Sequence, residues 1–156
     1  MSSDNNRNIG LSEIIRMLEN NVTFTQAADS VLECITDSMD ICDAVVMQID
    51  RESDTMHVIS ETGNCFKDES GTVKRSEFVL CSDAIKITYE GNADTAQKGL
   101  LDRLGVKLSI TVPILINNVK AMYLIVLSND VQAVSDNKIK EYISDKALVL
   151  HGIAQS

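Results

Sequence analysis

Thiols are the most reactive side chains in this sequence. The four cysteines are Cys34, Cys42, Cys65 and Cys81. No two of them have the C-x-x-C spacing of a redox pair, and no histidine cluster stands beside them to complete a zinc site. We therefore expect reduced, mostly buried thiols that pack as small apolar side chains.

The two histidines, His57 and His151, are the remaining candidates for binding a metal or a haem. His57 stands in a half-polar predicted strand, whereas His151 belongs to a predicted helix near the end of the chain. Because a metal site needs several converging ligands, a structural role is favoured and no metal site is predicted. No catalytic set of residues is discernible, so we do not expect an enzyme.

Composition and charge indicate one folded domain. The 156 residues are 44% hydrophobic and 24% charged, which is ordinary for a globular protein. A formal charge of −9 disfavours nucleic-acid and anionic-lipid partners. The polar start lacks a secretory signal, and the longest apolar stretch, 121–127, is too short to cross a bilayer, so a cytoplasmic location is expected. Residues 1–9 are expected to be a disordered lead-in, and residues 10–156 a single domain.

Helical spacing of apolar residues predicts four helices. They cover residues 11–20, 23–39, 94–104 and 135–154. Thr23 and Gln26 fit a capping box, in which two side chains satisfy amides left open at a helix start. Gly105 can take the left-handed conformation that ends the third helix.

Four extended segments are predicted, over residues 44–49, 55–61, 108–116 and 119–128. The first is apolar on both faces, as a central strand covered on both sides requires. The first two and the last two segments should each form a hairpin. Pro113 lacks an amide donor, so it should lie at an edge, at a bulge or facing a cavity. Residues 62–76 are expected to form a surface loop, residues 77–80 could form a short strand, and 82–90 fit either a strand or a helix.

The stretch from Leu104 to Ile114, which reads Leu-Gly-Val-Lys-Leu-Ser-Ile-Thr-Val-Pro-Ile, resembles the corresponding segment of GAF domains. In that family a Leu-Gly-(Val/Ile) step follows a short helix and leads into a strand ending in Val-Pro-(Ile/Leu). The order of predicted elements over about residues 22–153 is also similar to a GAF domain. One departure is Ala121, near the start of the partner strand, where the family usually carries Gly.

The resemblance implies an α+β fold of GAF-like (profilin-like) type. Its central antiparallel sheet would have five or six strands, with the N- and C-terminal helices on one face and a loop-covered pocket on the other. The doubly apolar strands agree with such an arrangement. Signatures of specialised relatives are missing: Phe66–Glu69 has the wrong order for the cyclic-nucleotide motif, and neither Cys65 nor Cys81 is followed by the His that commonly accompanies a bilin-attachment Cys. The ligand or cofactor is therefore unknown.

Two sets of residues are candidates for function. The pocket on the far face of the sheet would be lined by Met47, Phe78, Leu80, Ser82, Tyr89, Asp94, Leu101, Ser109 and Thr111. A homodimer through the terminal helices, the usual GAF arrangement, would bury Ile14, Leu18, Tyr142, Val149 and Ile153.

These features together predict a non-catalytic sensory or regulatory domain of a bacterial-type signal-transduction protein. It would bind a small molecule, mediate dimerisation, or both, and so control an attached output domain. Two alternatives stay open. One is a GAF-type free methionine-(R)-sulfoxide reductase, an alternative suggested by the four cysteines. The other is a dimerisation module without a ligand.

Overall fold

A computed structural model describes residues 23–50, 52–66, 72–74, 85–116, 119–130, 132 and 136–154. The predicted lead-in and the predicted helix over residues 11–20 lie outside the described residues. None of the described helices is long and apolar enough to cross a membrane.

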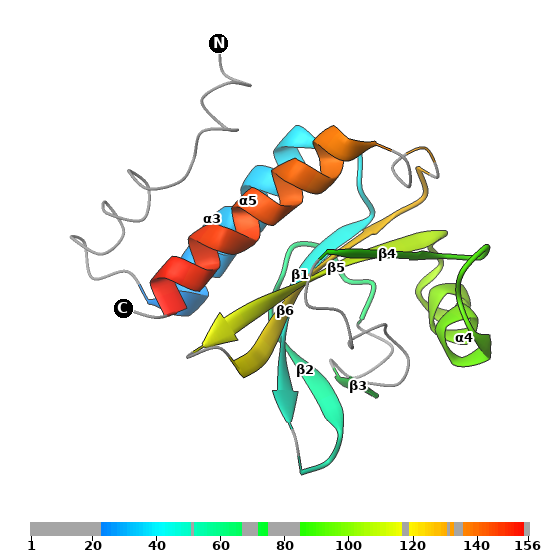
Figure 1. Cartoon of the computed structure of the whole chain (residues 1–156), viewed down its shortest axis with the longest axis horizontal. Helices are drawn as coiled ribbons and strands as arrows, with labels where there is room; N and C mark the ends of the chain where they lie inside the picture. The colour runs from blue at the N-terminus through cyan, green and yellow to red at the C-terminus, as the bar shows by residue number, and fades with distance from the viewer. Residues whose placement is uncertain are drawn as a thin grey trace.

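A six-stranded antiparallel sheet forms the centre of the molecule (Figure 1). The strands lie in the order β3-β2-β1-β6-β5-β4, so the first strand in the chain is central, as its doubly apolar sequence predicted. Both predicted hairpins are present, β1 with β2 and β5 with β6. The strands are β1 (Asp43–Asp50), β2 (Thr55–Glu61), β3 (Thr72–Lys74), β4 (Lys86–Tyr89), β5 (Leu108–Ile116) and β6 (Val119–Ser128).

Helices cover both faces of this sheet. Helices α3 (Phe24–Ser38) and α5 (Asn137–Ala154) lie side by side on one face, and α4 (Thr95–Leu104) packs on the other (Figure 1). Each face has its own apolar core. In β1, Ala44 and Val46 join the core beneath α3 and α5, whereas Val45 and Met47 join the core beneath α4. This alternation is the period of two that a strand imposes on its side chains.

The predicted helix boundaries are confirmed by capping contacts. The amide of Gln26 donates to Thr23 Oγ1 over 3.2 Å, and the amide of Thr23 donates to Gln26 Oε1 over 2.9 Å. At the end of α4, Gly105 has φ 72° and ψ 30°, the left-handed conformation expected of a glycine C-cap.

Four local features differ from the expectation or complete it. Strand β3 lies within the segment expected to be a loop, and β4 resolves the ambiguous segment 82–90 in favour of a strand. Pro113 lies opposite Tyr123 and two residues beyond Thr111, where the described pairing of β5 with β4 ends, so its missing amide removes no bond to β4. In β2, Val46 pairs with Ser60 and Met47 with Val58, so the intervening residue is bulged, a device that re-aims the side chains after it.

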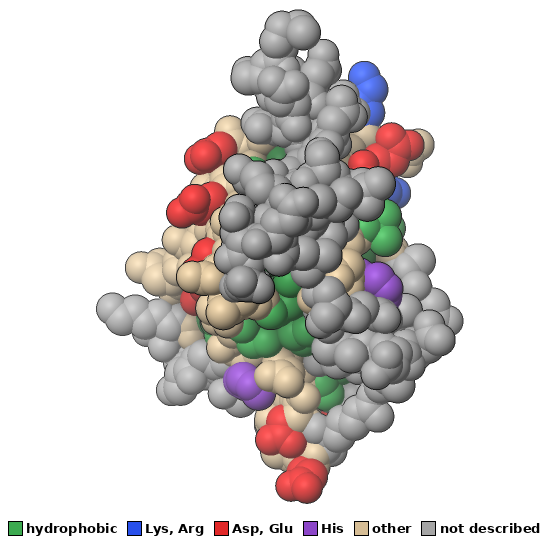
Figure 2. Space-filling view, turned by 90° about the vertical axis from the view of Figure 1, so that its left-hand side faces the viewer, with side chains coloured by type: hydrophobic (Ala, Val, Ile, Leu, Met, Phe, Trp, Pro, Cys, Tyr) green, Lys and Arg blue, Asp and Glu red, His purple; other side chains and the backbone are tan. Residues whose placement is uncertain are grey.

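The surface carries the excess of acidic residues. Figure 2 shows one face of the molecule, on which acidic side chains are more widespread than basic ones, as the net charge of −9 requires.

Candidate functional site

A cavity of about 620 Å³ lies between α4, the end of β4 and the connection from α4 to β5. This volume falls within the range of ordinary small-molecule sites. The residues that line it are Tyr89, Glu90, Gly91, Lys98, Leu101, Asp102, Val106 and Lys107.

Two sets of side-chain hydrogen bonds hold the rim of the cavity in place. Asn92 Nδ2 donates to the carbonyl of Ile87 over 2.8 Å, and Asn92 Oδ1 accepts from the amide of Tyr89 over 2.8 Å. One amide side chain therefore satisfies both backbone groups of an edge strand, as a neighbouring strand would. Two residues later, Asp94 and Gln97 form a second capping box at the start of α4, with bonds of 2.8 and 2.9 Å. The turn that carries Glu90 is thus fixed to β4 at one end and to α4 at the other.

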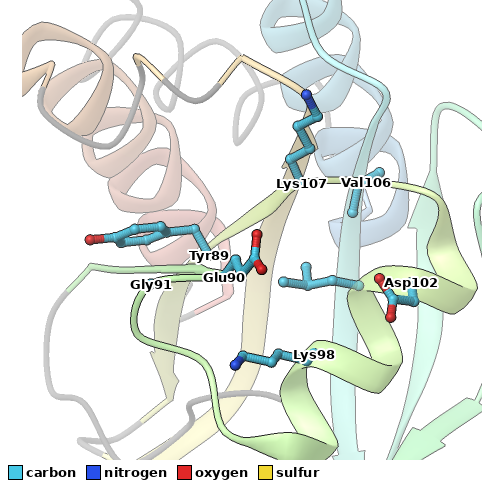
Figure 3. A pocket seen from close by; sticks show the side chains of 8 residues that line it. Tyr89, Glu90, Gly91, Lys98, Asp102, Val106 and Lys107 are labelled. Carbon is cyan, nitrogen blue, oxygen red and sulfur yellow. The ribbon is translucent and has the colours of Figure 1, made fainter.

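Charged side chains of both signs surround an apolar floor. Leu101 and Val106 are buried, whereas Glu90, Lys98, Asp102 and Lys107 are exposed. In Figure 3, Glu90 projects from the end of β4 toward the open space, Lys98 and Asp102 come from α4, and Lys107 comes from the start of β5. No ion pair joins these four charged groups to one another within the described part of the chain. The cavity therefore offers two ammonium groups and two carboxylates that a ligand can engage.

The structure places the predicted pocket residues in several environments. Tyr89 and Leu101 line the cavity, and Asp94 caps α4 from an exposed position. Met47 is fully buried in the core beneath α4, where it fills space. Phe78, Leu80 and Ser82 lie outside the described residues.

Ser109 and Thr111 are buried side chains of β5, each about 2% exposed. Thr111 Oγ1 donates to the carbonyl of Lys86 over 3.4 Å, and Ser109 pairs with Thr88 of β4. Thr88 Oγ1 is buried and has no hydrogen-bond partner among the described residues. Because its neighbour Ile87 faces the core beneath α3 and α5, the strand alternation directs Thr88 toward the face that carries α4.

A second hollow, of about 470 Å³, lies between α3 and the end of β2. Its charged lining residues are all acidic. Ser60, turned by the bulge in β2, donates to Asp29 of α3 at the edge of this hollow. The lining consists of Asp29, Glu33, Thr36, Asp37, Ser60, Glu61 and Thr62.

Beside this hollow two carboxyl groups meet. Asp43 is 1% exposed, and its oxygens accept from the amides of Gly63, over 2.7 Å, and Cys65, over 3.3 Å. Glu61 accepts from the amide of Phe66 over 3.3 Å. Burial, the hydrogen bond to Asp43 and the charge of Asp43 together raise the pKa of Glu61 to about 8, and burial has the largest effect. Glu61 in its protonated form is the donor that this contact needs, because two carboxylates cannot share a hydrogen bond without a proton.

Comparisons with known proteins address the fold. No protein-family model matches the sequence, and no curated protein sequence matches it significantly. Solved structures do match. The phycoerythrobilin-bound GAF domain of a cyanobacterial phytochrome superposes with a TM-score of 0.76 at 12% identity, over 97% of this chain and 96% of that one. The GAF domain of an Acinetobacter phosphoenolpyruvate-protein phosphotransferase gives a TM-score of 0.65 at 17% identity, over 92% and 89% of the two chains.

This chain has the fold of a GAF domain. The same fold is found in an enzyme, since the free methionine-R-sulfoxide reductase of Neisseria meningitidis, solved with its substrate, gives a TM-score of 0.69 at 12% identity, over 92% and 84% of the chains. At such identities the likeness fixes the GAF fold and the α+β class that the sequence predicted. It leaves the ligand and the activity of this domain to be argued from its own residues.

Four charged residues of this cavity were not among the predicted pocket residues: Glu90, Lys98, Asp102 and Lys107. Each is an ordinary exposed charge in its own segment, and only the packing of α4 against the end of β4 brings them together. Lys98 and Asp102 are four residues apart, so the sequence alone could have predicted that these two charges share one face of the helix.

The cysteines that the structure describes are less buried than expected. Cys42 is exposed, and Cys34 and Cys65 are half-buried, so the prediction of mostly buried thiols is wrong for the described positions. Cys81 lies outside the described residues. Burial raises the pKa of Cys65 to about 11, and the nearby charges of Asp43, Cys42 and Glu61 act in the same direction. This thiol therefore stays protonated at neutral pH.

Three of the residues predicted for a dimer interface lie in the core of the domain itself. Tyr142, Val149 and Ile153 are at most 8% exposed, and Tyr142 donates from its hydroxyl to the carbonyl of Cys34 in α3 over 3.1 Å. The extra apolar width of α5 is thus covered within the chain, because α5 packs on α3 as well as on the sheet. Ile14 and Leu18 lie outside the described residues.

Proposed function

We propose that this GAF domain is a non-catalytic sensory or regulatory module of a bacterial-type signalling protein in the cytoplasm, and that it binds a small molecule in the cavity beside α4. The observation that carries the proposal is a cavity with a hydrogen-bonded rim, a buried apolar floor and four charged side chains that form no ion pair with one another among the residues that the structure describes. A few fixed polar groups over an apolar surface are what gives small-molecule sites their specificity.

The fold provides a path from the cavity to the helices on the opposite face. Val106 and Lys107 lead directly into β5, whose Leu108 and Ile110 share a core with Ile143 of α5. A ligand would control an output domain attached to α5 by having unequal affinity for two arrangements of this helix. Any signal must come from that difference in affinity, since equal binding to both arrangements shifts nothing.

Thermal-shift screening of the purified domain tests the proposal. The panel contains nucleotides, tetrapyrroles and small metabolites, and we expect at least one compound to raise the melting temperature. The stabilisation should fall in Lys107→Glu and persist in Lys138→Glu, which changes an exposed lysine of α5 outside the cavity. A panel without any stabilising compound would instead favour a module without a ligand.

Homodimerisation through the terminal helices is also part of the proposal. With Tyr142, Val149 and Ile153 buried, the surface that α5 can offer includes Leu148, which is 63% exposed. An exposed large apolar side chain beside charged residues suits the centre of a small contact. Light scattering after size exclusion should report a dimer that Leu148→Glu converts to a monomer, and an unchanged mass would exclude this face of α5.

The second candidate function is reduction of free methionine sulfoxide, which the likeness to the Neisseria enzyme favours. That chemistry requires an accessible thiolate and a resolving thiol. The raised pKa of Cys65 opposes a nucleophilic role for this residue, whereas Cys42 is exposed. An assay of thiol-dependent turnover of free methionine-(R)-sulfoxide decides between the two functions, and turnover lost in Cys42→Ser would replace the sensory proposal.

A further inference from the structure

We infer that the cavity beside α4 binds a free α-amino acid with an apolar side chain, held by both its ammonium and its carboxylate group. The inference rests on the proposed function, because it names the ligand class of the same cavity. It follows from the signs of the charged groups that line the cavity and from its apolar floor.

The lining is balanced in charge. Lys98 and Lys107 can each donate to a carboxylate, while Glu90 and Asp102 can each accept from an ammonium group. Charge-assisted hydrogen bonds of this kind are about twice as strong as bonds between neutral groups. A ligand with one group of each sign can satisfy a donor and an acceptor of the lining at once.

Ligands of a single sign fit this lining less well. An anion such as a nucleotide would bring its phosphates near Glu90 and Asp102, on a domain whose net charge of −9 already repels anions. A cation would meet Lys98 and Lys107 in the same space. A zwitterion has no net charge, so the field of the whole protein does not oppose its entry.

The floor of the cavity suits an apolar side chain. Leu101 and Val106 are 6% and 7% exposed, so they present limited but apolar surface between the charged groups. Tyr89 also lines the cavity, but its ring packs against the core beneath α3 and α5 and points away from the α4 residues in Figure 3, so Leu101 and Val106 supply the apolar floor. An aliphatic or aromatic side chain placed there removes apolar area from water on both sides of the contact.

The side-chain hydrogen bonds at the rim of the cavity favour selective binding. Asn92 and the capping box of Asp94 fix the turn that carries Glu90 before any ligand arrives. A ligand therefore loses little free energy in ordering this turn, which is the benefit of a preorganised site.

Isothermal titration with L-leucine, N-acetyl-L-leucine and L-leucinamide tests the inference. The acetylated compound lacks the ammonium group and the amide compound lacks the carboxylate, while the side chain is the same in all three. We expect leucine to bind and each blocked compound to bind at least about tenfold more weakly. L-Phenylalanine, L-glutamate and L-lysine test the preference for an apolar side chain.

Variants of exposed residues locate the site with little risk to folding. Lys98→Gln should weaken leucine binding about tenfold and leave the weak binding of leucinamide unchanged, since that compound has no carboxylate. Glu90→Gln should weaken leucine and spare N-acetyl-leucine. Lys138→Gln and Glu52→Gln, which change exposed residues outside the cavity, should leave every affinity unchanged.

The outcomes separate this inference from the proposed function. If no amino acid binds at millimolar concentration but a nucleotide, a tetrapyrrole or another metabolite stabilises the domain through the cavity, the ligand class is wrong and the sensory function stands. If leucine binds equally well to a Lys98→Gln/Glu90→Gln double variant, the cavity is the wrong site. If neither the amino acids nor the wider panel binds, both the inference and the proposed function fail.

Discussion

Replacing Glu61 with glutamine should remove most of a pH dependence from the stability of this domain. Glu61 lies half-buried beside Asp43, and its pKa is raised from 4.5 to about 8, first by burial and then by its hydrogen bond to Asp43. Between pH 4.5 and pH 8 the folded chain therefore holds a proton that the unfolded chain has released. The free energy of unfolding must fall as pH rises through this window, and it should level off above about pH 8.

The magnitude is limited by the partial exposure of the carboxyl group. Solvent screening reduces the effect of the shift, so we expect a contribution of about 1–2 kcal/mol across the window. In Glu61→Gln the side-chain amide can donate to Asp43 and its oxygen can accept from Phe66, as protonated Glu61 does, but it cannot ionise. The variant should match the wild type near pH 5 and exceed it in stability near pH 9.

Urea denaturation followed by circular dichroism, repeated at each pH unit from 5 to 9, measures this difference. Other ionisable groups lie near the pair: Cys42 and Cys65 beside Asp43, and the carboxylates of Asp29, Glu33 and Asp37 across the acidic hollow. Subtracting the variant from the wild type removes their shared contribution, and Glu52→Gln, an exposed glutamate in the β1–β2 turn, serves as the matched control. Parallel curves for wild type and Glu61→Gln would refute the shared proton.

Two further predictions concern glycines and thiols. A Cβ on Gly91 would lie 2.5 Å from Cε2 of Tyr89, so Gly91→Ala should lower the free energy of unfolding by about 1–2 kcal/mol. A Cβ on Gly99 of α4 would make only an ordinary contact, 3.8 Å from Nη1 of Arg103, so Gly99→Ala should raise the free energy of unfolding by about 0.5–1 kcal/mol. Urea titration of both variants checks the opposite signs, and two effects of the same sign would contradict the packing. Iodoacetamide at pH 8 should label exposed Cys42 well before Cys65, whose raised pKa leaves little thiolate, and peptide mass spectrometry showing the reverse order would disprove the assigned environments.

Sequence reasoning succeeded for features that neighbouring residues determine. The capping box of Thr23 and Gln26 involves residues three apart, and the C-cap at Gly105 depends on the backbone freedom of one residue. The hairpin of β5 and β6 follows from two runs of branched residues around a short turn, and the apolar faces of β1 predicted its central position. These local structures form as predicted because the interactions that stabilise them join residues that are close together in the sequence.

The candidate site needed the tertiary structure. Glu90 and Lys107 are 17 positions apart, and neither residue carries a local pattern that distinguishes it from an ordinary surface charge. Asp43 and Glu61 likewise belong to different strands, and their contact depends on the turn at Gly63 and on the bulge in β2.

The sequence by itself determined the helices and hairpins of this domain, because periodicity and capping are properties of adjacent residues, and its resemblance to GAF domains implied how they are arranged. The burial of Tyr142 and Val149 against α3, the exposure of Cys42 and the charges around the cavity were decided only by packing. The physical reason is that burial and electrostatic environment depend on which distant segments fill the space around a side chain, and that information is absent from the residue's own neighbours in the sequence.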